Sequence, residues 1–354
     1  MTSKILWNNQ IHLRADGYSY AAQELTARLA DIGVFTFEDV DHNLQAIFQK
    51  NNINIGMVHQ GVPDIDYDIL VNNVLPVDYA KTNKYNIGFS YWETTALPDS
   101  WVPKLNECNE VWTTSKWAVD VFKSSGVDVP VYGFDLGVDT DTFKYMDNLR
   151  SMNPFTFLHV GSPSKRKNTQ LVVDAFLKLY KNNPDYRLIV KSSGPPDARI
   201  WEGQSIVSSI YEIQNINVID HYLSNSFLAQ LFGRVNCLVY PTMGEGWGMI
   251  PFQSIACGVP TICTNATACT EFAELSVPLE ADMADSNLFG IYSKGYWANP
   301  KIDDVCDKML YVVNNYDEVL KKTLDGSKII HDNYSWDKVV IPYRERLLEV
   351  QNII

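Results

Sequence analysis

Short apolar runs alternate with helical stretches along this chain of 354 residues. The first run, 4–7, is followed by a polar loop that ends at Gly17. Ala21, Leu25 and Leu29 then recur at a spacing of four, which predicts a strand, a glycine turn and a helix. Further short runs bounded by Gly, Pro or Asn are expected to be strands: 53–59, 69–74, 87–91 and 111–114. This alternation predicts βαβ units around a parallel sheet.

A second alternation begins after a polar stretch, 144–154, which has no apolar periodicity and is the best candidate for a linker. The later apolar runs are 155–160, 187–191, 216–220 and 237–240, and helices are expected from Gln170, Ser224 and Met249. The pattern predicts an α/β protein with two doubly wound, Rossmann-like domains, 1–148 and 149–337. Ligands are expected in the cleft between the lobes, beyond the carboxyl ends of the strands.

Composition and charge narrow the class of protein. Apolar residues make up 46% and charged residues 20% of the chain, as in ordinary globular proteins. With 29 basic and 42 acidic residues, the formal net charge of −13 opposes non-specific attraction to nucleic acid or anionic lipid. No apolar run reaches the ~20 residues that span a bilayer, and 1–14 does not look like a signal peptide. We therefore expect a cytoplasmic protein without a transmembrane segment.

The most specific segment is 241–253, which follows the apolar run 237–240. It places Glu245 among three glycines where a strand is expected to end and a helix to begin. Free N–H groups and the positive end of the helix dipole favour an anion there, and glycines let it approach the backbone closely. The segment therefore predicts an anion site with a carboxylate beside it. The alternative is a tight turn that needs glycine for its backbone geometry.

This segment resembles the donor-binding motif of a known enzyme family. Residues 245–248, the helix up to 258–260 and Glu271 are similar to the motif of retaining, nucleotide-sugar-dependent glycosyltransferases of the GT-B fold, the family-four (group 1) type. The resemblance spans nearly the whole chain. It also includes Gly17, 137–139 with Phe143, the segment up to Lys167, and 334–336.

The resemblance implies a GT-B architecture of two Rossmann-like lobes. Residues 1–148 would form the acceptor-binding domain and 149–337 the donor-binding domain. A last helix is expected from about Asp337, and the resemblance implies that this helix, 338–354, crosses back to pack on the N-terminal lobe. Its expected apolar face is formed by Val340, Tyr343, Leu347 and Leu348.

In that family a first glutamate contacts the transferred sugar, and a second, after seven intervening residues, holds the ribose hydroxyls of the nucleotide. Here the first position is Glu245 and the second is Gln253. Glutamine carries no charge, but it can accept from one hydroxyl and donate to another. The other donor-binding residues that the resemblance implies are Gly17, Lys165, Arg166, Lys167, Gly246, Trp247, Gly248 and Met249.

The basic cluster 165–167 follows the apolar run 155–160 by a short loop. Lys167 matches the lysine that the family places against the donor diphosphate. The family's arginine position is Ser162 here, so Arg166 or Lys165 can replace it. Fixed cations stabilise the charge that builds on a leaving diphosphate, which predicts catalytic roles for Lys167 and Arg166 beside Glu245. The alternative is a solvated run of charges in a loop.

The segment 88–94 is expected to open toward the acceptor. It has no histidine, where many family members carry one, so Glu93 is the leading candidate to orient or deprotonate an acceptor hydroxyl. Tyr91 and Trp92 could stack on a sugar or base. Tyr18 and His59 are further candidates for the acceptor side. The alternative is that the aromatic residues belong to the core, that Glu93 pairs with a cation and that His59 is structural.

We expect no metal site and no cofactor besides the nucleotide-sugar co-substrate, for which a UDP-sugar is the leading candidate. In a different glycosyltransferase fold, Asp-x-Asp pairs hold a divalent cation, but here they fall in the wrong lobe, and 42 acidic residues produce such pairs by chance. The six cysteines lack metal-ligand spacing and are interpreted as buried thiols. The aspartates concerned are Asp64, Asp66, Asp68, Asp139 and Asp141.

The predicted reaction is transfer of a sugar from a nucleotide-sugar to an acceptor hydroxyl with retention at the anomeric carbon and without a metal ion. The acceptor classes left open are a glycan, a small molecule and a hydroxymethylated DNA base, so that nucleic acid enters only as an acceptor. The alternatives are a nucleotide-sugar epimerase of the same fold and a non-catalytic or decayed sugar-nucleotide-binding protein, for which Gln253 would be the sign.

Overall fold

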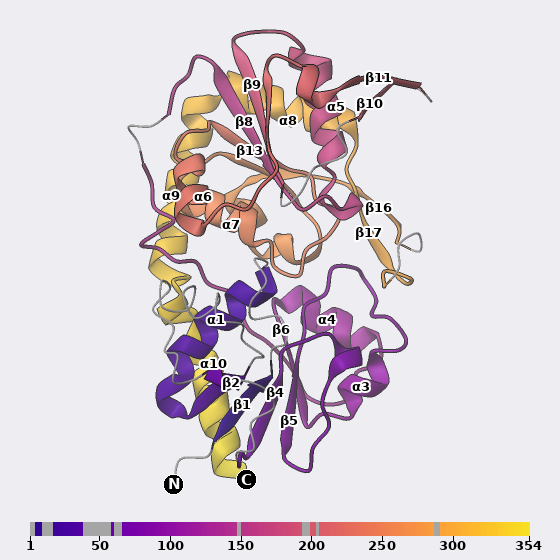
Figure 1. Ribbon diagram of the computed structural model, residues 1–354, viewed down its shortest axis with the longest axis vertical. Helices are drawn as coiled ribbons and strands as arrows, with labels where there is room; N and C mark the ends of the chain where they lie inside the picture. Colours follow the sequence, from indigo (N-terminus) through magenta and orange to yellow (C-terminus); the bar gives the residue numbers. More distant parts are fainter. Residues whose placement is uncertain are drawn as a thin grey trace. The chain divides into compact units, whose positions relative to one another are not determined.

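The described part of the chain forms two compact α/β units. The structure is a computed structural model, and it describes residues 4–8, 17–37, 58–59, 66–146, 150–192, 199–202, 205–286 and 291–354. Unit 1 comprises Met1–Gly137, Asn287–Gly295 and Tyr334–Ile354 in their described parts, and unit 2 comprises Val138–Ser286 and Tyr296–Asn333. In each unit helices flank a parallel sheet (Figure 1), so the predicted pair of Rossmann-like folds is confirmed.

Unit 1 is built on a seven-stranded parallel sheet in the order β3-β2-β1-β4-β5-β6-β7. The chain reverses direction across the sheet after β3, so β1 and β4 are neighbours, and their carboxyl ends form a switch point of the kind where ligands bind. The strands are β1 Ile5–Asn8, β2 Val34–Phe37, β3 Val58–His59, β4 Ile69–Asn72, β5 Tyr85–Phe89, β6 Glu110–Thr113 and β7 Val131–Gly133. The helices are α1 Gly17–Leu29, α3 Val102–Asn106, α4 Lys116–Ser124 and α10 Trp336–Ile353. Of the predicted strand 53–59, residues 53–57 lie outside the described residues.

Helix α10 packs within unit 1, as the resemblance implied. The ring of Tyr343 lies 4.6 Å from that of Phe134, centroid to centroid, and the Arg346 guanidinium pairs with the Glu110 carboxylate at 2.6 Å. The apolar face predicted for this helix is buried except for Leu348, which is 39% exposed. Because successive helical side chains are rotated by about 100°, Leu348 turns away from the sheet when its neighbour faces it.

Unit 2 contains a six-stranded parallel sheet in the order β12-β9-β8-β13-β14-β15, and its switch point lies between β8 and β13. The strands are β8 Phe155–Val160, β9 Tyr186–Lys191, β12 Ile216–Ile219, β13 Cys237–Tyr240, β14 Thr261–Thr264 and β15 Val277–Leu279. The helices are α5 Thr169–Tyr180, α6 Asn225–Phe232, α7 Met249–Ala256, α8 Ile302–Asn314 and α9 Tyr316–Asn333. Two antiparallel pairs lie outside this sheet: β10 Arg199–Glu202 with β11 Ser205–Ser209, and β16 Asp282–Asp285 with β17 Tyr296–Asn299.

The two units divide between Gly137 and Val138, whereas the sequence placed the boundary after 148. The expected linker is partly anchored to unit 2, which explains the difference. Arg150 donates hydrogen bonds to the carbonyl oxygens of Cys257 and Gly258 at 2.9 and 2.7 Å. A polar composition therefore did not mark a free linker here, because Arg150 within it bonds to unit 2.

Unit 1 also takes in segments that the sequence assigned to the second domain. It includes the chain from Tyr334 rather than from 338, and it includes the described residues 291–295. In the latter segment the Lys294 carbonyl accepts from the Thr94 hydroxyl at 3.2 Å, and the Lys294 ammonium pairs with Asp99 at 2.6 Å. These contacts join residues that are far apart in the sequence, so composition could not have assigned the segment.

The cysteines agree with the interpretation made from their spacing. All six cysteines are free and buried, as interpreted from their scattered positions. Burial raises the pKa of the Cys257 thiol to about 12, so this sulfur is an unreactive thiol at neutral pH. Among the helices in the described part of the chain, none combines the length and the apolar character needed to span a bilayer.

Candidate functional site

The candidate site lies at the carboxyl edge of the unit 2 sheet, at the switch point between β8 and β13. Strand β8 is followed by a short 3-10 turn, Lys165–Lys167, and β13 by the glycine-rich segment that leads into α7. The carbonyl oxygen of Arg166 accepts from the backbone N–H of Met243 at 2.8 Å and from the Thr242 hydroxyl at 3.3 Å. The two loops therefore form one support, which brings the predicted cations to the predicted carboxylate.

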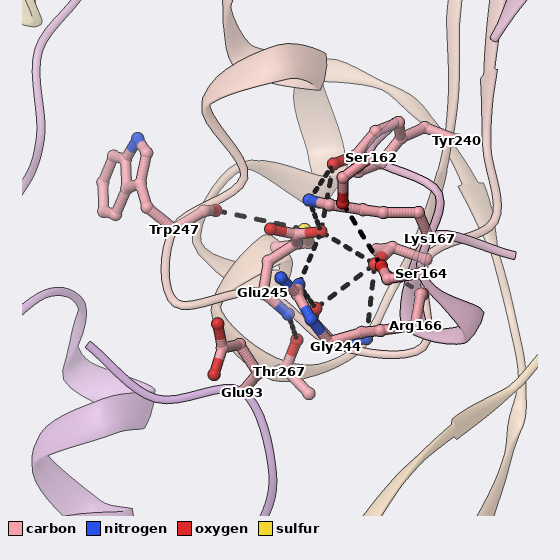
Figure 2. Close-up of polar contacts among 12 residues, drawn as sticks. Glu93, Ser162, Ser164, Arg166, Lys167, Tyr240, Gly244, Glu245, Trp247 and Thr267 are labelled. Carbon is pink, nitrogen blue, oxygen red and sulfur yellow. Dashed lines mark hydrogen bonds and ion pairs between the residues drawn. The ribbon is translucent and has the colours of Figure 1, made fainter. Parts of the chain in front are cut away.

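Glu245 is the buried carboxylate at the centre of this support, 7% exposed. Its Oε1 accepts from Lys167 Nζ at 2.7 Å, from the Thr242 hydroxyl at 2.8 Å and from the Tyr240 hydroxyl at 3.0 Å. The same oxygen lies 3.1 Å from Arg166 Nη1. Figure 2 shows Lys167, Arg166 and Tyr240 converging on one end of the carboxylate. None of its contacts with described residues uses Oε2, so this oxygen is able to accept a hydrogen bond from a ligand.

The neighbours of Glu245 also fix its charge. Burial by itself would raise the pKa of this carboxyl, but the charges of Lys167 and Arg166, with the hydrogen bonds from Lys167 and Thr242, outweigh burial and lower the pKa from 4.5 to about 2. Burial raises the pKa of the Tyr240 hydroxyl well above its usual range, so this group is a neutral donor. Glu245 is therefore an anionic hydrogen-bond acceptor and too weak a base to take a proton near neutral pH.

Arg166 and Lys167 point into the site, whereas Lys165 is exposed. The Arg166 and Lys167 side chains are 16% and 14% exposed, and they carry further bonds to the Gly244 carbonyl and to the Tyr240 hydroxyl. Of the two residues that could replace the arginine at position 162, the structure brings Arg166 to Glu245. Two fixed cations beside one carboxylate leave a net positive charge, which suits a bound anion.

Gly248 has a structural reason to be glycine. It adopts φ +97° immediately before α7, and a Cβ there would lie 2.9 Å from the Cys269 sulfur and 3.0 Å from the ring of Phe272. The tight-turn alternative therefore holds for this glycine. Gly246 is buried in the same segment, and Met249 is the first, half-buried residue of α7, so the N-terminus of the helix begins where the resemblance placed the anion.

Trp247 and Gln253 are buried residues with unused polar groups. Trp247 is 4% exposed, and its ring packs against Phe252 at 5.5 Å. Its indole N–H has no hydrogen-bond partner among the described residues, and Figure 2 shows the ring directed away from the cluster around Glu245. Gln253 is 3% exposed, and its side-chain amide makes no hydrogen bond within the described ranges. Buried polar groups normally have hydrogen-bond partners. The indole N–H of Trp247 and the amide of Gln253 therefore have capacity left for a ligand.

Three residues that the sequence reasoning missed hold Glu245 in place. Tyr240 and Thr242 bond its carboxylate, and Thr267 accepts from its backbone N–H at 3.0 Å. Thr267 adopts φ +54°, which is rare for a β-branched residue. Tyr240 and Thr242 could have been found from the two-residue alternation at the end of the predicted strand. The conformation of Thr267 leaves no signal in its own sequence.

A neutral histidine supports the basic turn from the sheet. His159 bonds the Val239 carbonyl through Nδ1 at 2.9 Å, so Nδ1 carries the hydrogen, and Nε2 accepts from the Thr169 hydroxyl at 3.0 Å. Burial lowers its pKa from 6.5 to about 4. A Cβ on Gly161 would lie 2.9 Å from Lys167 Cβ and 3.1 Å from His159 Nε2, so glycine lets the Lys167 stem lie on the strand end.

In unit 1, two of the predicted acceptor residues contact each other. The Tyr18 hydroxyl accepts from the backbone N–H of Tyr91 at 2.9 Å and lies 3.1 Å from the Ser90 hydroxyl, and the two tyrosine rings are 4.0 Å apart. Burial raises the pKa of Tyr18. Gly17 is the exposed first residue of α1, and His59 is the last residue of β3.

The stacking role predicted for Trp92 is wrong, because its ring is part of the unit 1 core. Trp92 is 1% exposed, and its indole N–H donates to the Thr94 hydroxyl at 2.9 Å and to the Ala96 carbonyl at 2.8 Å. The core alternative explains this residue. Glu93 next to it is half-buried, and its Oε2 accepts from the Tyr292 hydroxyl at 3.4 Å. Glu93 belongs to unit 1 and Glu245 to unit 2.

The described Asp-x-Asp residues make local contacts. Asp66 is largely exposed and pairs with Lys84 at 3.3 Å, and Asp68 accepts from the backbone N–H of Lys4 at 3.1 Å. Asp139 accepts from the backbone N–H of Asp141 at 3.1 Å. Asp64 lies outside the described residues.

The chain matches a known family over the part that carries this site. The family "Glycosyl transferases group 1" matches residues 141–318, just over half of the chain, including the loops that carry Lys167 and Glu245. The chain belongs to this family. The matched residues include those of the described site in unit 2. The GT-B fold predicted from the resemblance is confirmed.

Group 1 relatives match the chain over different lengths. A putative glycosyltransferase 45 of Sulfolobus islandicus filamentous virus is 20% identical over 313 residues, which cover 83% of this chain and 84% of the relative. The serotype-specific mannosyltransferase WbdA of Escherichia coli is 27% identical over 123 residues, 34% of this chain but 14% of WbdA. The Anabaena HepE protein, solved in complex with UDP and glucose, has a TM-score of 0.71 at 12% identity and covers 98% of this chain and 99% of its own, which shows the shared fold.

Proposed function

We propose that this group 1 family member transfers a sugar from a nucleotide-sugar, with a UDP-sugar as the leading candidate, to an acceptor hydroxyl. Unit 2 binds the donor and unit 1 the acceptor. The observation that carries the proposal is the half-used carboxylate of Glu245, whose Oε1 is bound to two cations while Oε2 has no partner among the described residues. This arrangement can hold a neutral hydroxyl on Oε2 of Glu245 and an anion on the two cations beside it.

Glu245 binds the sugar in this proposal. Oε2 accepts a hydrogen bond from a sugar hydroxyl, and the partners on Oε1 keep the carboxylate ionised and fixed in one rotamer. A hydrogen bond to a charged acceptor is stronger than one between neutral groups, so this contact favours the sugar over water. Gln253 supplies a buried amide with unused capacity for the ribose hydroxyls.

Lys167 and Arg166 bind the diphosphate. Both cations contact Glu245 Oε1, Lys167 at 2.7 Å and Arg166 at 3.1 Å. A diphosphate placed beside them gains charge-assisted hydrogen bonds, and these bonds strengthen as the leaving group acquires negative charge. This arrangement supports departure of the diphosphate without a metal ion.

The proposed step retains the configuration at the anomeric carbon. The bond from that carbon to the diphosphate oxygen breaks with its electron pair going to the diphosphate, and the acceptor oxygen bonds to the carbon from the same face. The acceptor proton passes to the departing phosphate oxygen, and Glu93 orients the acceptor hydroxyl. Glu245, with a pKa of about 2, is a poor nucleophile and a poor base, which supports a mechanism without a covalent sugar–enzyme intermediate.

Relatives and structural neighbours support a nucleotide-sugar donor, and they include both UDP and GDP types. HepE is solved with UDP and glucose and with UDP-glucose, and a Mycobacterium tuberculosis relative, 24% identical over 143 residues, is named a GDP-mannose-dependent mannosyltransferase. The chain spans 14% to 46% of the length of the first curated relatives it matches, so the acceptor is left as any of the three classes above.

The test measures thermal stabilisation and nucleotide release with a panel of UDP-, GDP-, ADP- and CMP-sugars in the presence of EDTA. One nucleotide-sugar present at ~100 times its dissociation constant should stabilise the wild type by roughly 2.7 kcal/mol. The variant Glu245→Gln should still bind the free nucleoside diphosphate but should lose its preference for the sugar-bearing form. If no nucleotide-sugar binds the wild type, the decayed-protein alternative replaces this proposal.

A matched control separates loss of the site from loss of the fold. Lys178 is a lysine on α5 with a side chain 54% exposed, and Lys178→Met should bind the same nucleotide-sugar as the wild type. Lys167→Met should lose the diphosphate. If both variants lose binding equally, the effect comes from the fold of unit 2 and the role assigned to Lys167 is wrong.

A further inference from the structure

Lys191 is a buried lysine that the proposed reaction does not use. It is the last residue of β9, and it is 8% exposed. Its ammonium donates to the Ser192 carbonyl at 2.8 Å, and no carboxylate pairs with it among the described residues. Lysine is almost never buried to this extent without an anion, because desolvating an ammonium is costly. Burial lowers its pKa accordingly.

The side chain of the next residue, Ser192, is also buried with unused hydrogen-bonding capacity. Ser192 is 2% exposed, and its hydroxyl has no hydrogen-bond partner among the described residues, although its backbone N–H donates to the Ile219 carbonyl at 2.8 Å. A buried polar group without a partner loses its hydrogen bond to water and gains none in return, which is unfavourable. Two consecutive residues at the end of one strand therefore keep unused donors with respect to the described residues, and these donors are available to a ligand.

The register of the sheet places Lys191 on the face that carries the Glu245 cluster. Val160 of β8 pairs with Lys191, and Leu158 pairs with Leu238 of β13, so Val160 is level with Tyr240 two residues further on. Side chains at paired positions of parallel strands point to the same face, and adjacent strands lie ~4.8 Å apart. Lys191 therefore lies about two strand spacings, ~10 Å, across the sheet edge from Tyr240. Figure 1 shows β9, β8 and β13 side by side in this order.

An elongated ligand bound at Glu245 and Lys167 by its sugar diphosphate would extend along this edge. We propose that Lys191 and Ser192 contact the nucleoside end of the donor and select a base that presents a carbonyl oxygen there. This inference rests on the proposed function. The unused ammonium hydrogens can only donate, so they bind a keto oxygen and oppose the exocyclic amino group that replaces it in cytosine or adenine.

Two pairs of nucleotides test the selection. Uracil and cytosine differ at one ring position by a keto oxygen against an amino group, as guanine and adenine do, so UDP is compared with CDP and GDP with ADP by titration calorimetry. The wild type should bind the keto member of one pair about tenfold or more tightly than the amino member, the equivalent of one charge-assisted hydrogen bond. Lys191→Met should bring that ratio close to one by weakening the keto nucleotide.

The control and a second variant keep the inference falsifiable. Lys178→Met makes the same substitution at an exposed position and should leave the ratio unchanged. If Lys191→Met does not fold, as judged by circular dichroism, Ser192→Ala should lower the ratio by about threefold, corresponding to one neutral hydrogen bond. A folded Lys191→Met or Ser192→Ala with the wild-type ratio overturns the inference and leaves the proposed function standing. If the wild type binds none of the four nucleotides, the proposed function itself fails.

Discussion

Two buried carboxylates, Glu110 of unit 1 and Glu245 of unit 2, have similar partners but use them differently. Glu110 is fully buried, and both of its oxygens are bonded: Oε1 by the Trp112 indole at 2.7 Å and Oε2 by the Tyr85 hydroxyl at 2.9 Å. Arg346 donates to both oxygens. Glu245 also has a tyrosine hydroxyl and an arginine, yet its contacts with described residues all fall on Oε1.

The difference separates a structural carboxylate from a recognition group. A carboxylate accepts about four hydrogen bonds over two oxygens, so a saturated one has nothing left to offer a ligand. One that is held on a single oxygen keeps its charge and orientation while half of its accepting capacity is unused. Burial and an arginine partner are common to both sites, so neither feature identifies the functional one; the distribution of the hydrogen bonds does.

The largest effect should come from removing Arg346, which bonds both oxygens of Glu110. Arg346→Met leaves Glu110 buried without its cation, and losing one partner of a buried pair is expected to lower the free energy of unfolding by about 3–5 kcal/mol. Urea unfolding measures this loss, and donor binding by the folded fraction should stay unchanged. A loss below ~1 kcal/mol would mean that Glu110 does not need Arg346, and the comparison would fail.

The corresponding change in unit 2 should affect rate rather than stability. Lys167→Met removes a cation that stabilises the leaving diphosphate, and kcat is expected to fall by roughly 10²–10³-fold. Steady-state kinetics with the donor that the nucleotide-sugar panel identifies provides the measurement. Lys178→Met serves as the control. An unchanged kcat with a large fall in unfolding free energy would place Lys167 in the same structural class as Arg346.

Acid should lower the free energy of unfolding through His159, the buried imidazole on β8. The pKa of His159 is about 4 in the fold against 6.5 unperturbed, so below pH 6.5 the unfolded chain binds a proton that the folded chain does not. Its contribution is therefore present above pH 6.5 and is lost as pH falls toward 4, by up to about 3 kcal/mol at 1.36 kcal/mol per unit.

The measurement is the free energy of unfolding in urea at pH 7 and at pH 5. His159→Asn keeps a donor for the Val239 carbonyl but cannot titrate, so it should flatten the pH dependence over this interval. A variant with the same slope as the wild type would assign the acid sensitivity to other groups.

The smallest effect should come from losing the hydrogen bond that the backbone N–H of Glu245 donates to the Thr267 hydroxyl. Thr267→Val keeps the branched shape at φ +54° but leaves the Glu245 N–H without its acceptor, whereas Thr267→Ser restores the hydroxyl. We expect about a tenfold fall in kcat for the valine variant, equal to ~1.4 kcal/mol, and recovery to within about twofold for serine. Equal kinetics for the two variants would show that the hydroxyl does not position Glu245.

The parts of the site that could be predicted are those encoded by a short segment after a strand. Glu245 and Lys167 each follow an apolar run by a fixed, short distance, and the carboxyl ends of neighbouring parallel strands meet at one edge. The alternation of apolar runs predicted both sheets, whereas the packing of the last helix on unit 1 was implied by the family resemblance. It could not distinguish Lys165 from Arg166, because the direction of each side chain depends on the 3-10 turn that carries them.

The parts that could not be predicted depend on contacts between distant segments. Trp92 looked available because it follows a strand, but its indole N–H and ring are enclosed by the loop that it begins. The expected linker proved to be bonded to unit 2 through Arg150. The left-handed conformation of Thr267 is imposed by its surroundings and not by its residue type.

The return of α10 has a consequence for how the chain is made. Glu110 and Arg346 are separated by 236 residues, which a ribosome adds in roughly 12–47 s at ~5–20 residues per second. For most of that interval the strands of unit 1, of which the last is β7, have been synthesised, but the helix that neutralises the buried carboxylate has not. Unit 2, which ends at Asn333, is fully synthesised first. During biosynthesis unit 2 can therefore reach its final form while unit 1 still waits for α10 to emerge.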